Sequence, residues 1–343
     1  MKTIETERLI LRKFTEDDFA AVHSYAACLE NVVYMPFGPN REEDTRSFIN
    51  NSIVSAEADA VTNYQFAAIL KETGKLIGGC GYGLRLSGDE AEAGWILHRD
   101  YWKRGFGAEM GEALLKFGFE ELKLHRITAH CDAENTGSYR IMEKIGMRRE
   151  GLFIEARPAN KLSDKKYGDE LCYAILKDEW ETRREIEYYN SLPCVFEGFI
   201  DLPELSDGEI FLVCEKKSPG NIEKNLVPAY HFAICRNSER IGEIALRIGY
   251  SERLYFGGQI GYNVDEGHRG RSYAGRACRL IIPVAKAHGM KKLIITNNPE
   301  NAASVRVCEK LGARLIRAAR LPEGHDLRAM GRVFQNIFEW DIL

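Results

Sequence analysis

The sequence predicts a mixed α+β protein of two domains, each with a twisted mixed central sheet flanked by helices. Its 343 residues exceed one typical domain and suit two. A glycine-bearing segment at 101–108 returns in altered form at 268–274, and the motifs downstream of it return 166 positions later. Because this period far exceeds that of solenoid repeats, a whole domain is duplicated. We expect domains at 1–181 and 195–343, joined by a linker at 182–194.

Composition limits the kinds of partner. The chain is 45% hydrophobic and 29% charged with a formal net charge of -4, which is ordinary for a globular protein and unlike the basic field that nucleic-acid binding requires. No apolar stretch reaches the length of a membrane span. Nine cysteines occur without a C-x-x-C pair or a secretory signal, so we expect reduced thiols, no metal site and a cytoplasmic location.

Hydrophobic periodicity and turn residues predict the elements of the first domain in order. The chain opens with a strand at 5–12, and Thr15 with Asp18 three positions on resembles a capping box that opens a helix. The remaining expected elements are a helix at 42–58, strands at 64–70, 75–86 and 91–97, a helix at 108–122, a strand at 126–131, a helix at 138–144, a strand at 173–176 and a charged helix at 178–189. The strand at 91–97 thus connects through a helix to a parallel strand, and this β-α-β unit carries both repeated motifs.

The second domain is expected to be shorter than the first. It opens with a strand at 209–215 and continues to a hairpin at 230–235 and 240–246, which aligns with the hairpin of the first domain. Proline and glycine residues fill the segment between them. The helices that follow the first strand of the first domain are therefore expected to be missing here.

The segment from Trp102 to Ala108 lies where a strand ends and a helix begins. Unpaired backbone N–H groups and the positive end of the helix dipole meet at such a junction and suit a pyrophosphate, to which Lys103 and Arg104 add positive charge. A Gly-x-Gly before a helix is by itself more often only a tight turn. A Rossmann fingerprint fits poorly because it requires G-x-G-x-x-G near the start of a β-α-β half, and no Walker loop is present.

Two motifs downstream of this loop make the pattern specific. An N-x-x-S motif followed by E-K-x-G begins at Asn135 and again at Asn301. Together with the loop, these motifs resemble those of the acetyl-CoA-dependent N-acetyltransferases of the GNAT superfamily. Residues 3–181 are most similar to the RimJ/RimL-like branch, whose members acetylate protein N-terminal amines or small-molecule amines. The second half resembles a shortened GNAT domain.

The resemblance implies a role for each motif. The loop cradles the CoA pyrophosphate, the N-x-x-S segment lines the pantetheine arm, and backbone N–H groups at the preceding strand polarise the thioester carbonyl. The implied CoA-binding residues of the first domain are Ile96, Leu97, Trp102, Lys103, Arg104, Gly105, Phe106, Gly107, Ala108, Asn135 and Ser138. Those of the second domain are Arg269, Gly270, Arg271, Ser272, Tyr273, Ala274, Asn301 and Ser304.

The resemblance also implies two catalytic residues. Glu92 matches the glutamate that often serves this branch as general base, and Ser138 is placed to protonate the CoA sulfur. A solvated strand residue is the alternative for Glu92, and a helix cap is the alternative for Ser138. We expect direct transfer of acetyl from acetyl-CoA to a primary amine of a small molecule or a peptide, mainly in the first domain. An acyl-CoA-binding or regulatory protein with little turnover is the alternative function.

The second domain differs at two of these positions. Gln259 stands in place of the base and Ser272 in place of a loop glycine, and glutamine cannot act as a base at neutral pH. One interpretation is a second active site with its own acceptor, for which His325 and Asp326 are candidates. The other, which we favour, is a non-catalytic domain that packs against the first and replaces the partner of a homodimer. The protein is then expected to be a monomer or a homodimer.

Overall fold

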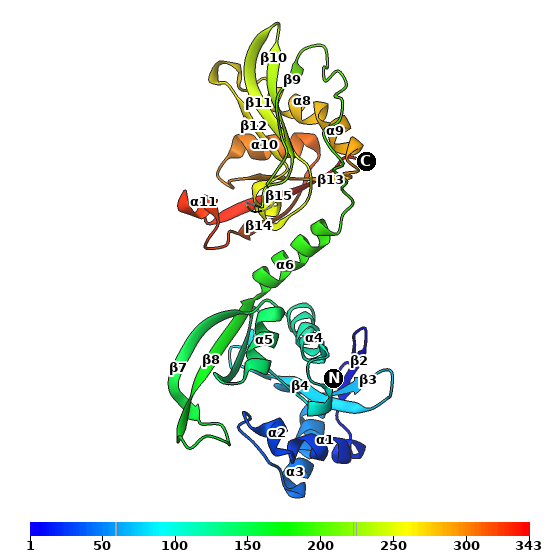
Figure 1. Ribbon diagram of the computed structural model, residues 1–343, viewed down its shortest axis with the longest axis vertical. Helices are drawn as coiled ribbons and strands as arrows, with labels where there is room; N and C mark the ends of the chain where they lie inside the picture. Colours follow the sequence, from blue (N-terminus) through cyan, green and yellow to red (C-terminus); the bar gives the residue numbers. More distant parts are fainter. Residues whose placement is uncertain (59, 222, 224) are drawn as a thin grey trace. The chain divides into compact units, whose positions relative to one another are not determined.

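The computed structural model separates into two units (Figure 1). It describes residues 1–58, 60–221, 223 and 225–343. We call Met1–Trp180 unit 1 and Glu181–Leu343 unit 2. The division falls inside helix α6, Lys177–Asn190, so most of the segment expected as a linker at 182–194 is helical. No helix in these described ranges is both long and apolar enough to cross a membrane.

Unit 1 is built on one eight-stranded sheet. Its strands are β1 (Ile4–Glu5), β2 (Leu9–Lys13), β3 (Asn63–Leu70), β4 (Leu76–Leu84), β5 (Glu90–Leu97), β6 (Arg126–Asp132), β7 (Arg148–Pro158) and β8 (Tyr167–Leu176). Its helices are α1 (Phe19–Ala26), α2 (Leu29–Val32), α3 (Glu42–Glu57), α4 (Phe106–Glu120) and α5 (Thr136–Lys144). The strand order is β1-β2-β3-β4-β5-β6-β8-β7, in which β5 and β6 are parallel. The expected β-α-β unit is therefore present as β5-α4-β6.

Helices cover both faces of this sheet because alternate residues of its strands are buried on opposite sides. On β3, Phe66 and Ala68 belong to the core that includes α4, whereas Ala67 and Ile69 belong to the core that includes residues of α1 and α3. Phe117 of α4 packs edge-on against Phe66 with ring centroids 5.5 Å apart. The mixed α/β architecture predicted for the first domain is confirmed.

Several expected elements of unit 1 differ in detail: the strand expected at 5–12 is divided into β1 and β2, and the strand expected at 173–176 begins at Tyr167. Strand β7 was not predicted, because nearly all of its side chains are exposed and it lacks an apolar alternation. Helix α4 begins at Phe106, two residues before the expected start, because Gly105 is its N-cap. The expected capping box of Thr15 and Asp18 is present, and it opens a 3-10 turn that leads into α1.

Unit 2 differs from unit 1 in having two sheets and in the segment before its β10–β11 hairpin. Its strands are β9 (Phe211–Ser218), β10 (Ala229–Arg236), β11 (Glu239–Arg247), β12 (Ile260–Val264), β13 (Lys292–Asn297), β14 (Arg314–Arg320) and β15 (Phe334–Asp341). Its helices, after α6, are α7 (Glu252–Gly257), α8 (Tyr273–Leu280), α9 (Ile282–Ala287), α10 (Ala302–Leu311) and α11 (Asp326–Ala329). Between β9 and β10 the described residues contain no helix, as expected.

The single central sheet expected for the second domain is divided. One sheet has the order β12-β11-β10-β9 and the other β13-β15-β14. Gln259, which is fully buried, joins them: its backbone N–H donates to Ile294 O at 2.9 Å and its side-chain oxygen accepts from Ile294 N–H. Its side-chain NH2 also donates to Gly249 O at 3.0 Å. The residue in place of the expected base is therefore a structural bridge.

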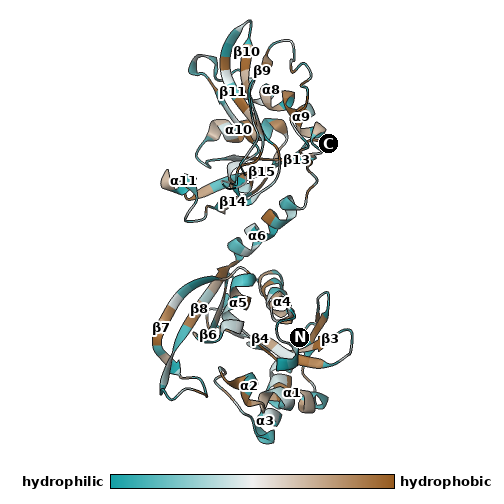
Figure 2. Cartoon of the chain, in the orientation of Figure 1, coloured by the Kyte–Doolittle hydropathy of each residue, from teal (hydrophilic) through white to brown (hydrophobic). Residues whose placement is uncertain are grey.

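Helix α6 is hydrophilic over most of its length (Figure 2). Two of its aromatic residues are nevertheless 3% exposed, and they lie in different cores. Trp180 packs in unit 1, where its ring lies 5.3 Å from that of Phe119, and Tyr189 packs in unit 2 beside Tyr255. This sharing explains why the division of the chain falls within a continuous helix.

Candidate active site

The loops before α4 and α8 each have two residues in the left-handed backbone region. In unit 1 these are Lys103 (φ 59) and Gly105 (φ 84). In unit 2 the equivalent residues are Gly270 (φ 79) and Ser272 (φ 63). Both loops therefore share one pattern of left-handed residues, with glycine at a different position in each. Ser272 thus adopts the same left-handed conformation before α8 that Gly105 adopts before α4.

Serine in the left-handed region carries a conformational cost that glycine does not. We expect Ser272→Gly to raise the free energy of unfolding of unit 2 by about 0.5–1 kcal/mol, because relief of strain outweighs the added entropy of the unfolded chain. Urea unfolding of the full chain measures this change. The matched control is Gly105→Ser, which should destabilise unit 1 by a similar amount. A destabilised Ser272→Gly variant would contradict the assignment.

The side chain at the second position of each repeated loop is tied to the preceding strand. Trp102 Nε1 donates to Leu97 O at 2.8 Å, and Arg269 Nε donates to Val264 O at 2.9 Å. The two bonds are equivalent although the residue types differ. The resemblance implies that Arg269 binds CoA, and in the structure its Nε–H is bonded to the last residue of β12.

The remaining loop residues divide by exposure. Lys103, Arg104 and Gly105 are exposed, whereas Phe106, Gly107 and Ala108 are buried. In unit 2, Arg271 and Ser272 are exposed, Tyr273 is buried and Ala274 is half-buried. A Cβ on Gly107 would lie 2.4 Å from Ile141 Cδ1, so this glycine permits α4 to pack on α5.

Sequence reasoning missed a polar cluster that supports the loop from the segment between β1 and β2. Glu109, in the first turn of α4, accepts from Thr6 Oγ1 at 2.6 Å, from Arg8 N at 2.8 Å and from Arg8 Nε at 2.7 Å. Arg8 Nη1 donates to Arg104 O at 3.0 Å. Burial alone would raise the pKa of Glu109, but these hydrogen bonds lower it below its ordinary value. In the sequence, Thr6 and Arg8 fall within the strand predicted at 5–12, and that pattern does not indicate a contact with Glu109.

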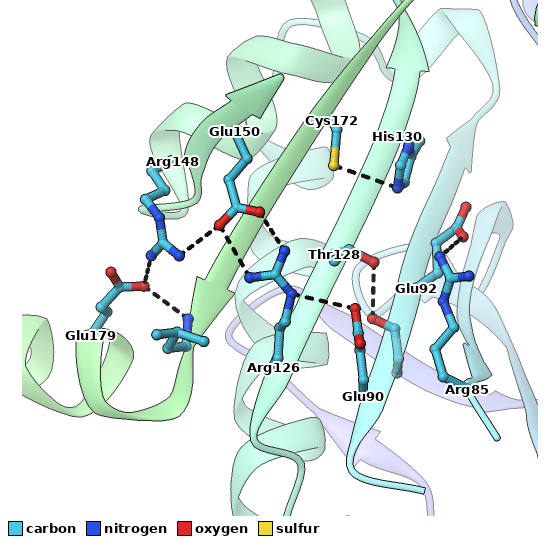
Figure 3. A network of polar contacts seen from close by, with 12 residues as sticks. Arg85, Glu90, Glu92, Arg126, Thr128, His130, Arg148, Glu150, Cys172 and Glu179 are labelled. Carbon is cyan, nitrogen blue, oxygen red and sulfur yellow. Dashed lines mark hydrogen bonds and ion pairs between the residues drawn. The ribbon is translucent and has the colours of Figure 1, made fainter. Parts of the chain in front are cut away.

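Glu92 lines a cavity of about 730 Å³ in unit 1. Its carboxylate pairs with Arg85 Nη2 at 3.2 Å, and the two side chains are 47% and 52% exposed (Figure 3). Apolar residues of the same wall include Phe37 and Phe48, and Asp44 contributes a second carboxylate. The structure thus places Glu92 on a cavity wall in a solvated ion pair, and Arg85 is a partner that the motifs did not indicate.

Strands β5 and β6 separate immediately beyond Glu92. Their parallel ladder has three pairs, of which Glu92 with Thr128 is the last. His98 N donates to Ile77 O on β4. In an antiparallel pair every second residue of a strand points its backbone N–H and C=O toward the same neighbour, so Ile96 also points these groups toward β4. The N–H groups of Trp95 and Leu97 then face the gap. Of the two strand residues predicted to bind the thioester, Leu97 has this orientation and Ile96 does not.

A network of ion pairs connects the first residues of β5 and β6 to β7 (Figure 3). Arg126 on β6 bonds Glu90 on β5 at 3.3 Å and Glu150 on β7 at 3.1 Å. Arg148 donates to the same Glu150 at 2.6 Å and also pairs with Glu179. The network ties β5, β6 and β7 together just below the point where the gap opens.

Asn135 and Asn301 have the same role in the two units. Asn135 Oδ1 accepts from Ser138 N at 3.1 Å, and Asn301 Oδ1 accepts from Ser304 N at 3.1 Å. Each asparagine is the N-cap of its helix, with φ -78 and ψ 74 in unit 1 and φ -83 and ψ 75 in unit 2. The alternative that the Ser138 hydroxyl caps this helix is therefore wrong: the capping oxygen is Asn135 Oδ1, and Ser138 contributes only the backbone N–H that the cap accepts.

The Ser138 side chain lies close to the Cys131 thiol. Burial raises the pKa of Cys131 to about 11, so this thiol stays protonated at neutral pH. In unit 2 the equivalent hydroxyl, that of Ser304, lies 2.9 Å from the hydroxyl of Tyr262 on β12. The two helix starts therefore carry different hydroxyl partners.

His325 and Asp326 both line a cavity of unit 2, but they do not form a pair. His325 Nδ1 accepts from Leu327 N at 3.2 Å at the start of α11. Asp326 pairs with Arg253 Nη2 at 2.9 Å. The histidine is a helix cap and the carboxylate a surface ion-pair partner, so the two do not form an acid–base couple.

Comparison with known proteins gives consistent matches. The sequence profile of the acetyltransferase (GNAT) domain matches residues 8–148 and 210–314. The chain is 38% identical over 178 residues to the uncharacterized N-acetyltransferase YnaD of Bacillus subtilis (strain 168), covering 52% of this chain and 98% of that protein. It is 31% identical over 185 residues to the uncharacterized N-acetyltransferase p20 of Bacillus licheniformis, covering 52% and 99%.

Solved structures are also similar. An acetyltransferase (GNAT family) from Bacillus anthracis is 40% identical, with a TM-score of 0.46, and the match covers 52% of this chain and 99% of that one. Spermidine N-acetyltransferase from Vibrio cholerae, in complex with CoA and spermine, is 20% identical with a TM-score of 0.44, covering 51% and 99%.

Proposed function

The chain belongs to the GNAT acetyltransferase family, and from this premise we propose that unit 1 transfers acetyl from acetyl-CoA directly to a primary amine. The observation that carries this proposal is the position of Glu92. Its side chain lines the cavity at the last pair of the β5–β6 ladder, where the two strands begin to separate. A carboxylate at that point can accept a proton from an amine that approaches the gap.

The charge of the unit 1 cavity supports an amine acceptor. Asp44 and Glu92 are the carboxylates of its described wall, and Arg85 is the cation. Asp44 is charged at neutral pH, as aspartates ordinarily are, and a hydrogen bond from Arg41 lowers its pKa further. Aromatic residues of the wall, such as Phe48, can contact the carbon chain of the acceptor. An amine of a small molecule or of a peptide N-terminus suits this combination.

Residues around the gap suit acetyl-CoA, which supplies the thioester that the amine attacks. Lys103 and Arg104 are exposed beside the start of α4, where positive charge favours phosphate. We assign the N–H groups of Trp95 and Leu97 to the acyl carbonyl, because they face the gap. We assign to Ser138 the delivery of a proton to the departing sulfur, since its hydroxyl is half-buried at the start of α5.

The proposal is tested by following CoA release from acetyl-CoA over a panel of primary amines, with the full chain as enzyme. We expect turnover with at least one amine, and mass spectrometry of that amine should show the added acetyl group. A chain that binds acetyl-CoA in calorimetry yet acetylates no amine would support the alternative, an acyl-CoA-binding or regulatory protein. Amines with an apolar chain should react faster than short polar ones, because aromatic side chains such as Phe37 and Phe48 line part of the cavity.

A further inference from the structure

Unit 2 contains a cavity of about 730 Å³ with a cationic wall. This volume falls in the range of small-molecule sites. Its described lining includes four cationic side chains, those of Lys216, Arg247, Arg253 and Arg332, and one carboxylate, that of Asp326. The unit 1 cavity has the opposite balance, with two carboxylates and one arginine. The two cavities therefore favour ligands of opposite charge.

Strand register shows how this inversion arises. Phe66 pairs with Cys80 on the β3–β4 hairpin, and Phe232 pairs with Ile244 on the β10–β11 hairpin. This pairing aligns Cys80 of β4 with Ile244 of β11. Three residues further along each strand, Gly83 of unit 1 is therefore aligned with Arg247 of unit 2. That glycine, Gly83, is paired with Glu92, and Arg247 N donates to Gln259 O at 2.8 Å. Unit 2 has thus lost the carboxylate of this strand pair and gained a guanidinium beside the same position.

Arg247 has no carboxylate partner among the described residues. Its side chain is half-buried, and Nη1 donates to Gly258 O at 3.2 Å. Burial and, after it, the nearby charge of Arg253 lower the pKa of Arg247 below its ordinary value. A partly desolvated guanidinium is costly without a counter-ion, and a carboxylate is the group that matches its paired donors. Arg247 thus lines the cavity without a counter-ion among the described residues.

A second buried group in this cavity also lacks a partner. Gln335, on β15, is 3% exposed, and its side-chain oxygen has no hydrogen-bond partner within the described part of the chain. It belongs to the cavity lining together with Arg247. Buried amides are normally satisfied, because an unmade hydrogen bond costs free energy. A ligand with a polar group beyond its anion would satisfy this amide.

We propose that the unit 2 cavity binds a small molecule that carries an anionic group, a carboxylate or a phosphate, paired with Arg247. Unit 2 is then a ligand-binding unit and not a scaffold that has lost its site. The proposal goes beyond amine acetylation in unit 1 and does not depend on it.

The experiment is calorimetry of the full chain with benzoate, its neutral isostere benzamide, and phenyl phosphate. We expect benzoate or phenyl phosphate to bind and benzamide to bind at least tenfold more weakly, which is the loss expected for one charge-assisted hydrogen bond. The stronger of the two anions identifies the source of the anionic group. Equal affinity for benzoate and benzamide, or no binding of either anion, would overturn the proposal.

Three variants locate the site. Arg247→Met should weaken binding of the anion about tenfold or more and leave benzamide binding unchanged. Asp326→Asn removes the carboxylate of the described lining, whose side chain is 71% exposed, and should strengthen anion binding about twofold to threefold without affecting folding. The matched control in unit 1 is Arg85→Met, which should leave the affinity unchanged.

The two cavity variants protect the test against a misfolded protein. If thermal unfolding shows that Arg247→Met does not fold, Asp326→Asn alone decides, because its expected effect is a gain that a damaged protein would not show. A folded Arg247→Met variant with unchanged benzoate affinity would contradict the assignment, as would an Asp326→Asn variant that binds benzoate no more tightly. Loss of binding in Arg85→Met would place the anion in unit 1 and likewise refute the proposal.

Discussion

The Glu92→Gln variant is expected to acetylate its amine with a kcat about 10²- to 10³-fold below that of the wild type, the range over which a positioned general base acts. Glutamine keeps the size of the side chain and its place on the cavity wall, and it removes the carboxylate that is proposed to accept the proton. Because the loop that is proposed to bind CoA lies beyond β5, the KM for acetyl-CoA should remain within about twofold. Steady-state kinetics with the best amine of the panel measures both constants.

The matched control for this variant is Glu90→Gln. Glu90 lies two residues before Glu92, on the same strand and the same face. It forms an ion pair with Arg126 and does not line the cavity. The same chemical change there should alter kcat less than about threefold, since exposed or half-exposed ion pairs contribute little. An unchanged rate in Glu92→Gln would make Glu92 the solvated strand residue that was the alternative. Equal losses in both variants would indicate a structural effect on β5.

The Gln259→Glu variant should lower the free energy of unfolding of unit 2 by about 2–4 kcal/mol near neutral pH, because it places a carboxylate in a fully buried position. The protonated acid can still accept from Ile294 N–H and donate to Gly249 O, whereas the carboxylate cannot donate. Burial therefore raises the folded-state pKa of the new glutamate above its unfolded value of about 4.3. The penalty is small below that value and grows by about 1.4 kcal/mol per pH unit as the pH rises toward the folded-state pKa.

Hydrogen exchange of unit 2 peptides in the full chain, measured across this pH range, reports the change for unit 2 separately. The control is Asn263→Asp, an equivalent amide-to-acid change at an exposed position of β12, which should shift stability by less than about 0.5 kcal/mol. A Gln259→Glu variant as stable as the wild type at every pH would show that Gln259 does not bridge the two sheets.

The sequence allowed the β-α-β unit and its two motifs to be predicted because local chemistry specifies them. Asn135 and Asn301 adopt nearly the same φ and ψ, and each caps the helix that follows it. An N-cap depends on residues only three positions apart, so it is visible in one dimension. The edge strand β7 was missed for the opposite reason: its exposed side chains carry no apolar period.

The loop shows where comparison by residue identity fails. Aligning Gly105 with Ser272 suggested that unit 2 had lost a feature that unit 1 keeps. The backbone shows that the left-handed pair is retained and that the glycine has moved to position 270. A backbone conformation can be supplied by glycine or, at a small cost in free energy, by another residue, and the sequence does not distinguish these cases.

The sequence by itself determined the duplication, the GNAT resemblance and the loops that precede α4 and α8, because these depend on neighbours along the chain. Only the tertiary structure decided the charge of each cavity. Glu92 meets Arg85 across a hairpin, and Arg247 lies beside Gln259 on the neighbouring strand, in a cavity that also includes Gln335. Such groupings follow from strand register and from the separation of the sheets, which join residues far apart in sequence.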